Sequence, residues 1–346
     1  MATIVQEPGC SGVVGETTAL PGRTLPGVTY LLPLRVQAPD DDLARYLTGI
    51  VRLVDVLVVD GSPDDVRAAS ARRWPPGVRH VVAPPVPPGT NGKVVAVNHG
   101  LRVGTEPRVV VADDDVRYTP ETLAAVVRRL DRASAVRPQN YFSPAPWHAV
   151  WDEARTLLNR ALASDYPGTL AFRRDALGDE GYDPHVLFEN LELLRTVQAR
   201  GGTVDDADDV LVPRRPCRPT HFLRQRVRQA YDSHAQPLRL LAELALAPLL
   251  ALNVRRGRRL LVTALAAMAL AEAGRRRDGA RAAFRVTSSV LAPLWLLERA
   301  TTSWIALALR ATGGCPYAGR RIPLAAHSVR ALARSSRTST AAVPHL

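Results

Sequence analysis

The stretch RVVVADDDVRYTPETL, residues 108–123, decides the fold class. A short apolar run ends directly in three aspartates, and a helix-like segment follows from residue 120. The same alternation of a buried strand with a helix recurs between residues 28 and 138. Strands are expected at 28–34, 54–60, 78–83 and 108–112, and helices at 41–52, 63–73, 93–103 and 120–132. This alternation predicts an α/β fold with a mostly parallel, doubly wound sheet flanked by helices.

Two of these expected strands end in carboxylates, at Asp60 and at Asp113 to Asp115. In a parallel sheet, ligands bind beyond the carboxyl ends of the strands. Asp113 and Asp115 stand at alternate positions, so both can face a hard divalent cation that also holds a diphosphate. Oxygen ligands suit Mg²⁺ or Mn²⁺. The alternative interpretation is a solvated acidic turn, which is common after strands.

Lys93 is the only lysine of the chain and lies in TNGKVVAVNHG, residues 90–100. A phosphate-binding P-loop is excluded, because the pattern requires glycine where Pro87 stands and serine or threonine where Val94 stands. No G-x-G-x-x-G follows the first strand, which excludes the dinucleotide-binding fingerprint as well. The reason for a lysine at this position must therefore lie in another kind of site.

The chain of 346 residues has a formal net charge of +12 and a pI near 10.5. These values permit nucleic acid, an anionic membrane surface or phosphate-bearing substrates as partners. Nucleic acid is disfavoured, because the arginines are spread through apolar segments and tails without an aromatic-basic pattern. The cysteines Cys10, Cys217 and Cys315 match neither a disulfide framework nor a zinc spacing. The N-terminus shows no signal-peptide pattern, so export is not predicted.

The order of motifs carries a resemblance to a known family. A first strand with Pro33 is followed by VVVDGS, NGKVVAVNHGL, VVVADDDVRYTPETL, GTLAFRRDAL, FENLEL and RQRVRQAY. In this order and spacing, residues 28 to 232 resemble the family 2 glycosyltransferases of the GT-A fold, and most closely their ceramide glucosyltransferase-like branch. The resemblance implies a GT-A-like α/β domain that uses a nucleotide-sugar donor, with UDP as the expected nucleotide.

The resemblance also assigns roles to individual residues. Asp60 would contact the nucleotide base or ribose, and Asp113 and Asp115 would form the D-x-D that binds the metal ion and the donor diphosphate. The K-x-x-A-x-N and Q-x-x-R segments would contribute further donor contacts. The donor-binding residues implied in this way are Pro33, Asp60, Lys93, Asn98, Asp113, Gln225 and Arg228.

Two positions depart from the family pattern. The catalytic base is usually the aspartate of a Glu-Asp pair, whereas the pair here reads Glu189 and Asn190. An amide cannot take up a proton as a general base. The expected catalytic residues are therefore Glu189 or Glu192, one helical turn further on. The tryptophan of Q-x-x-R-W is replaced by Gln229.

The C-terminal third is apolar but interrupted. Runs at 238–254, 260–273 and 286–310 contain glutamates or arginines, and the first two are shorter than the roughly 20 residues of a bilayer span. Their connectors RRGRR and RRRDGAR are both strongly basic, which disfavours alternating spans. Helices lying in the membrane interface fit both facts. Soluble packing and short tilted spans remain the alternatives.

Four regions follow from these patterns: a flexible N-terminus at 1–27, a catalytic domain at 28–235, an apolar helical membrane-associated region at 236–310 and a flexible basic tail at 311–346. The expected activity is an inverting, metal-dependent transfer of a sugar to a lipid or saccharide hydroxyl at the cytoplasmic face of the cell membrane, with Mg²⁺ or Mn²⁺ as cofactor. The alternatives are a nucleotidyltransferase on a similar sheet and a non-catalytic sugar-nucleotide or membrane-binding module.

Overall fold

The computed structural model describes residues 24–341 of the chain. The stretch 108–123 folds as predicted, since a buried strand runs to Ala112 and a helix starts at Pro120. The Thr119 hydroxyl accepts a hydrogen bond from Thr122 N, and the Thr122 hydroxyl accepts one from Thr119 N. This reciprocal cap satisfies two backbone donors at the helix start and fixes where the chain turns after the aspartates.

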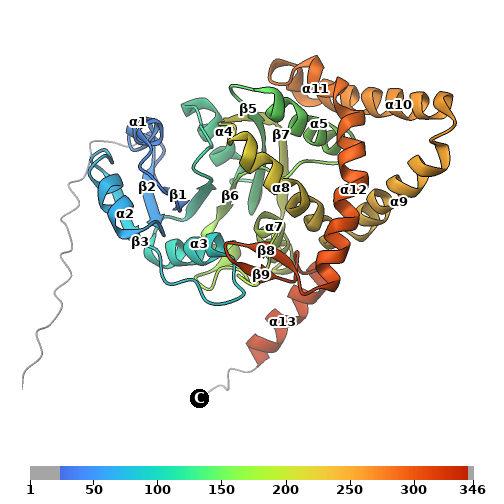
Figure 1. Ribbon diagram of the computed structural model, residues 1–346. Coiled ribbons are helices and arrows are strands. Elements are labelled where there is room, and N and C mark those ends of the chain that lie inside the picture. Colours follow the sequence, from blue (N-terminus) through green and yellow to red (C-terminus); the bar gives the residue numbers. More distant parts are fainter. Residues whose placement is uncertain (1–23, 342–346) are drawn as a thin grey trace, which may run out of the picture.

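A seven-stranded sheet forms the centre of the described residues (Figure 1). Its strands are β1 (Val28–Leu34), β2 (Asp55–Asp60), β3 (Val78–Val82), β4 (Arg108–Ala112), β5 (Ala135–Phe142), β6 (Thr169–Arg173) and β7 (Val204–Arg214). The spatial order is β3-β2-β1-β4-β6-β5-β7, and only β6 runs antiparallel to its neighbours. The mostly parallel sheet is confirmed, with the first four strands within one residue of their predicted bounds.

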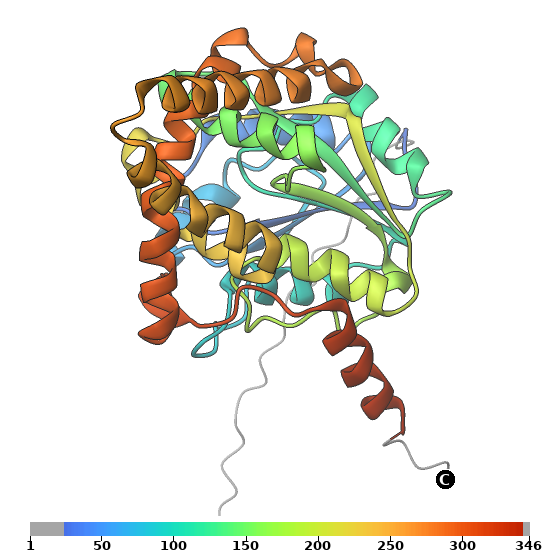
Figure 2. The same cartoon turned by 90° about the vertical axis from the view of Figure 1, so that its right-hand side faces the viewer.

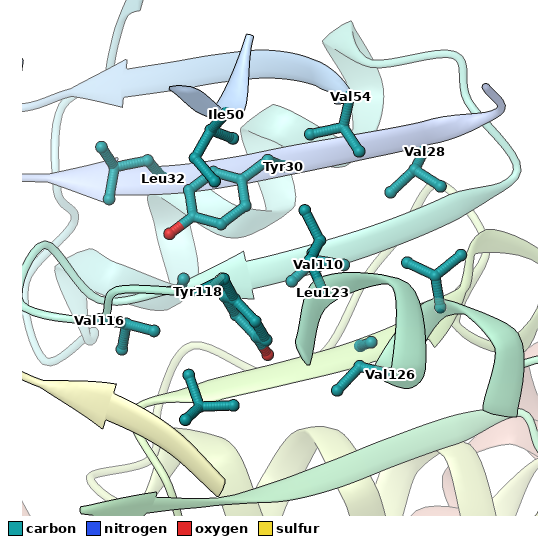
Figure 3. Packing of buried hydrophobic residues seen from close by; sticks show 14 of the residues in the cluster. Val28, Tyr30, Leu32, Ile50, Val54, Val110, Val116, Tyr118, Leu123 and Val126 are labelled. Atoms are coloured by element: carbon teal, nitrogen blue, oxygen red, sulfur yellow. The ribbon is translucent and has the colours of Figure 1, made fainter. Parts of the chain in front are cut away.

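Helices cover both faces of this sheet. They are α1 (Asp41–Ile50), α2 (Asp64–Ala71), α3 (Gly92–Val103), α4 (Pro120–Arg129), α5 (Trp147–Leu162), α6 (Arg174–Leu177), α7 (Glu189–Ala199) and α8 (Pro219–Tyr231). Alternate residues of β1 and β4 pack to opposite sides. Tyr30 and Val110 join one core with α1 and α4, and Leu31 and Val111 join the other with α3 and α7. Figure 3 shows the first core, where Leu123 and Val126 of α4 pack against the strands.

The apolar C-terminal runs form helices on the side of the molecule away from β3 (Figures 1 and 2). These are α9 (Pro237–Asn253), α10 (Gly257–Arg276), α11 (Val286–Val290) and α12 (Ala292–Ala311), with 3₁₀ turns η1 (Asp232–Ala235) and η2 (Arg277–Ala282). Gly274 lets α10 approach α5 closely, since a Cβ there would lie 2.0 Å from the Leu157 carbonyl oxygen. Among residues 24–341, no helix combines the length and apolarity that a bilayer span requires.

The last part of the chain differs from the predicted flexible tail. Residues 315–322 form a hairpin of β8 (Cys315–Tyr317) and β9 (Arg320–Ile322), and α13 (Val329–Ala341) follows. The Tyr317 hydroxyl donates to Asn91 Oδ1 at 3.1 Å, at the start of α3. This long-range contact ties the hairpin to the catalytic domain, which composition alone does not reveal. Residues 1–23 of the predicted flexible N-terminus, and 342–346 of the tail, lie outside the described residues.

Candidate active site

A cavity of about 1050 Å³ opens at the carboxyl ends of the parallel strands. Segments that follow β1, β4 and β7 contribute to its wall, together with the end of β5, α5, the start of α7, α8 and η1. This is the edge of an α/β sheet where ligands are expected. Ligand pockets in proteins usually measure roughly 300–1,000 Å³. The cavity therefore lies at the upper end of the range for ligand pockets.

The carboxylates that follow β4 line this cavity. The backbone N–H of Asp113 donates to the Gly168 carbonyl at 2.8 Å, which fixes the turn after the strand. A Cβ at Gly168 would lie 2.6 Å from Asp113 Oδ2, so a larger residue there would require this carboxylate to move. Burial, together with the charges of Asp115 and Asp113, raises the pKa of Asp114 to about 6. The predicted grouping of carboxylates at this strand end is thus present.

Two basic side chains compensate part of this negative charge. Lys93 Nζ lies 2.6 Å from Asp113 Oδ1, and Arg214 Nη2 lies 2.6 Å from Asp115 Oδ2. Asp115 Oδ1 is buried and has no hydrogen-bond partner among the described residues. A buried carboxylate oxygen without a partner is uncommon, and it leaves one oxygen ligand available.

Lys93 joins two parts of the site that are distant in sequence. Asn91 caps α3 by accepting from Lys93 N, and its side-chain amide donates to the carbonyls of Val186 and Leu187. From this position Lys93 Nζ also reaches Glu189 Oε1 at 3.1 Å. Burial opposes the charge, but the carboxylates of Asp113 and Glu189 raise the pKa of Lys93 well above its usual value. The lysine therefore stays protonated as the link between β4 and α7.

Glu189 and Arg228, two residues predicted for the site, lie together on the cavity wall. Arg228 Nη2 lies 3.8 Å from Glu189 Oε2, and its guanidinium lies over the Tyr317 ring at 4.7 Å. Burial favours protonation of Glu189, but the charges of Lys93 and Arg228 hold its pKa below the usual value. Asn190, at the position of the usual base, donates to the Pro167 carbonyl at 2.7 Å.

Four predicted donor-binding residues do not line this cavity: Lys93, which pairs with two residues that do, and Asp60, Asn98 and Pro33. Asp60 is fully buried and accepts from Ser62 N at 2.8 Å, and its Oδ2 lies 3.0 Å from His80 Nε2. Burial works against ionisation, but these two partners keep the pKa of Asp60 below its usual value. Asn98 Nδ2 donates to the Tyr182 carbonyl at 2.8 Å, and Pro33 pairs with Val59 inside the sheet. Their visible contacts are structural.

Glu192 is also not brought to the cavity, which corrects its prediction as a catalytic residue. It is fully buried along α7, and its two oxygens lie 2.7 Å from His327 N and 2.8 Å from His327 Nδ1. Glu192 lies one helical turn after Glu189. Its carboxylate binds His327 of the C-terminal segment and does not face the cavity.

The Q-x-x-R helix reaches the cavity, with differences in detail. Gln225 lines the wall and its Nε2 lies 2.6 Å from His221 Nε2. Gln229, which replaces the family's tryptophan, lines the wall with a buried side-chain oxygen that has no partner among the described residues. Tyr231, the nearby aromatic residue, is fully buried and donates to the Pro323 carbonyl at 2.6 Å, so it does not take the place of the tryptophan.

Sequence reasoning missed Arg214, which lines the cavity, and Tyr317, whose ring lies under the guanidinium of the wall residue Arg228. Arg214 is the last residue of β7, whose sequence VDDADDVLVPR is too polar to be predicted as a buried strand, so the strand-end rule could not be applied there. Tyr317 lies 3.1 Å from Asn91 Oδ1 through its hydroxyl, although the two residues stand 226 positions apart. No local pattern signals such a contact.

Comparisons with known proteins agree with this architecture. A family model, Glycosyltransferase like family 2, matches residues 43–231. A mannosyltransferase from Pyrobaculum calidifontis, solved with GDP-Man and Mn²⁺, is 20% identical, with 92% of this chain and 80% of that chain covered and a TM-score of 0.46. Glucosyl-3-phosphoglycerate synthase from Mycobacterium tuberculosis, solved with Mn²⁺, UDP and phosphoglyceric acid, is 19% identical, with coverages of 58% and 74% and a TM-score of 0.39.

Because both TM-scores lie below 0.5, neither likeness carries an argument about substrates. No curated protein matches the chain. The family match spans more than half of the chain and includes Asp113, Asp115, Glu189 and Arg228. The protein therefore belongs to glycosyltransferase-like family 2 and is a glycosyltransferase.

Proposed function

We propose that the protein is an inverting, metal-dependent glycosyltransferase that moves a sugar from a nucleotide sugar, with a UDP-sugar as the expected donor, to a hydroxyl of a saccharide or lipid. The observation that carries this proposal is that Asp113, Asp115 and Glu189 line one cavity and that Lys93 pairs with both Asp113 and Glu189. The finer resemblance to the ceramide glucosyltransferase-like branch forms part of the same proposal and concerns the acceptor.

The residues that follow β4 fit a divalent cation. Asp113 and Asp115 would hold Mg²⁺ or Mn²⁺, since hard cations prefer carboxylate oxygens and Asp115 Oδ1 has no partner among the described residues. When bound, such a cation supplies positive charge that stabilises the leaving diphosphate. The neighbouring Lys93 and Arg214 place positive charge beside these two carboxylates.

The basic side chains of the wall have two tasks in the transfer. Arg214 and Arg228 place guanidinium groups along the cavity, where they can pair with diphosphate oxygens. Lys93 pairs with both Asp113 and Glu189, and it therefore holds the aspartates after β4 and the start of α7 in a fixed position relative to each other. Glu189 is an ionised carboxylate on the wall, so it is able to accept a proton as a base. Its two cationic neighbours lower its pKa, which makes it a weak base.

The proposal predicts turnover of a nucleotide sugar by the purified protein. Incubation with a panel of UDP- and GDP-sugars and Mn²⁺ or Mg²⁺ should release a nucleoside diphosphate from one donor, through transfer or slow hydrolysis. Release of pyrophosphate in place of the nucleoside diphosphate would indicate a nucleotidyltransferase. Donor binding without any turnover would indicate a non-catalytic binding module and contradict the proposed reaction.

We further propose that the enzyme works at the cytoplasmic face of the cell membrane and binds the surface through an apolar arm, residues 244–271. The arm comprises most of α9 and α10 and contains no Asp or Glu. Its turn carries the exposed arginines Arg255, Arg256, Arg258 and Arg259. Large apolar side chains on either side of the turn are exposed, among them Leu252 at 75% and Val254 at 67%.

This combination supports an anionic lipid surface as the partner. Exposed leucines and valines gain free energy by entering the acyl boundary, and arginines are attracted to anionic headgroups. A symmetric contact between the arm turns of two copies would bring two sets of four arginines together, which like-charge repulsion disfavours. The charge of the arm therefore favours a membrane over a second copy of the chain.

Because of this arm, we expect the protein to bind anionic vesicles. The full chain should cosediment with phosphatidylcholine vesicles that contain phosphatidylglycerol and less with pure phosphatidylcholine. Changing the four turn arginines to glutamine should weaken binding at least about tenfold, since each basic residue near an anionic surface contributes about 1 kcal/mol. A matched control changes four exposed arginines remote from the arm, Arg52, Arg72, Arg128 and Arg132, to glutamine. No vesicle binding, or equal losses in both variants, would contradict the proposal.

A further inference from the structure

One end of the cavity wall is built from the last turn of α8 and from η1, and it presents polar atoms without partners. Gln229 Oε1, Asp232 Oδ1 and Ser233 Oγ are buried, line the cavity, and have no hydrogen-bond partner among the described residues. Ser233 is only 1% exposed. Buried polar atoms are nearly always hydrogen-bonded, so several orphans on one wall indicate a ligand that supplies donors.

We propose that this wall binds the hydroxyl groups of a saccharide or other polyol acceptor, and that Asp232 accepts the proton of the attacking hydroxyl. The inference rests on the proposed glycosyl transfer and names its acceptor class. Each of the three orphan atoms can accept a hydrogen bond. A polyol offers several O–H donors within a few ångströms, whereas a simple lipid alcohol offers one.

The position of Asp232 distinguishes it from Glu189. Asp232 comes four residues after Arg228, so both face the same side at the end of α8. Glu189 is bound by Lys93 at 3.1 Å and lies 3.8 Å from Arg228, so its charge is already compensated. No described residue forms an ion pair with Asp232 within 4.0 Å. Asp232 therefore keeps a carboxylate oxygen free for a substrate proton.

The surroundings of Asp232 set its protonation in the useful range. The charged groups that face it are Arg228 of α8, Glu189 of α7, Arg299 of α12 and Arg239 of α9. Burial raises the pKa of Asp232 to about 7, with the arginines opposing and Glu189 adding to the shift. A general base acts best when its pKa is close to the working pH. Transfer should thus increase as the pH rises through about 7.

The step balances without a further reactant. The acceptor oxygen forms a bond to the anomeric carbon of the donor, and its proton passes to a carboxylate oxygen of Asp232. The bond from the anomeric carbon to the diphosphate oxygen breaks, and its electron pair leaves with the nucleoside diphosphate. Asp232 then returns the proton to solvent.

The test uses the full chain with Mn²⁺ and a panel of methyl glycosides, with n-butanol as an alcohol that has a single hydroxyl. Binding is measured with UDP present, and transfer with the UDP-sugar that the donor panel identifies. Glycoside binding, followed by saturation-transfer NMR, should weaken about fivefold in Ser233→Ala and in Gln229→Ala, as expected for one lost hydrogen bond. Asp232→Asn should keep glycoside binding but transfer about 10²- to 10⁴-fold more slowly and lose the pH dependence near 7. Asp232→Glu should restore part of the rate, and the exposed Asp131→Asn is the matched control.

Each result decides the inference. If UDP binds but no glycoside does, or if the alanine variants bind glycosides as the wild type does, the acceptor subsite is overturned while the proposed function stands. An Asp232→Asn protein with the wild-type rate and pH profile overturns the role of Asp232. If UDP does not bind to the wild-type protein, the proposed function fails together with this inference.

Discussion

Replacement of Asp115 by alanine should lower glycosyl transfer by about a thousandfold or more, the largest effect on activity expected for this protein. Asp115 Oδ1 is the buried oxygen left free on the cavity wall, and Oδ2 is held by Arg214 at 2.6 Å. Alanine removes an oxygen ligand and leaves the Arg214 charge without its nearest carboxylate. Release of nucleoside diphosphate in the presence of Mn²⁺ measures the rate, and electron paramagnetic resonance measures the affinity for Mn²⁺.

The exposed Asp65 provides a matched control for this substitution. Asp65→Ala removes the same group from the first turn of α2, away from the cavity wall, and should leave both the rate and the Mn²⁺ affinity unchanged. If Asp115→Ala retained the wild-type rate and bound Mn²⁺ equally well, the assignment of a metal ion to this strand end would be wrong.

Replacement of Lys93 by methionine should lower the free energy of unfolding by about 3–5 kcal/mol, because removing one partner leaves buried carboxylates uncompensated. Lys93 lies 2.6 Å from Asp113 and 3.1 Å from Glu189, and its side chain is only 15% exposed.

Lys93→Arg keeps the charge but introduces a broad planar group into a confined site. It should therefore fold normally and use the donor less well. Urea unfolding and nucleotide release measure the two effects.

The Lys93→Met effect should also depend on pH in a defined direction. The folded-state pKa of Glu189 is lowered, so its ion pair stabilises the fold above the ordinary glutamate pKa of about 4.3. This contribution is lost as the pH falls through the lowered value. The stability difference between the wild type and Lys93→Met should thus be largest near neutral pH and shrink in acid. Arg108→Met, which breaks an exposed pair, should cost no more than about 1 kcal/mol. Equal effects of the two substitutions would contradict the link assigned to Lys93.

The N-terminal half of the sheet could be predicted because its strands are locally unambiguous. Val56, Leu57, Val58 and Val59 are all fully buried, so the apolar run of β2 follows directly from its position inside a parallel sheet. The strands β5 and β7 carry Arg137, Asn140 and several aspartates, whose ion pairs and hydrogen bonds form only in the fold. Their apolar pattern is therefore too weak to read locally.

The residues of the site that could be predicted are those whose motifs lie at the ends of strands or in the expected order along the chain. Asp113 and Asp115 lie where the strand rule expects them, and Glu189 and Arg228 share the same cavity. The contact of Lys93 with Glu189 joins residues 96 positions apart and depends on how α3 packs beside α7. Asp60, Asn98 and Glu192 each bind a residue away from the cavity. A motif specifies residue types, but it does not specify which neighbours the fold brings within hydrogen-bond distance.

The hairpin of β8 and β9 has a consequence for the order in which the protein matures during synthesis. Tyr317 touches Asn91 and lies below the guanidinium of Arg228, yet it is translated long after both. At about 5–20 residues per second, synthesis of the intervening C-terminal helices takes several seconds. Throughout that interval the nascent chain has its sheet and its aspartates but lacks the Tyr317 contacts with Asn91 and Arg228. The start of α3 and the Arg228 side chain therefore gain their contacts with Tyr317 only after helices α9 to α12 have been made.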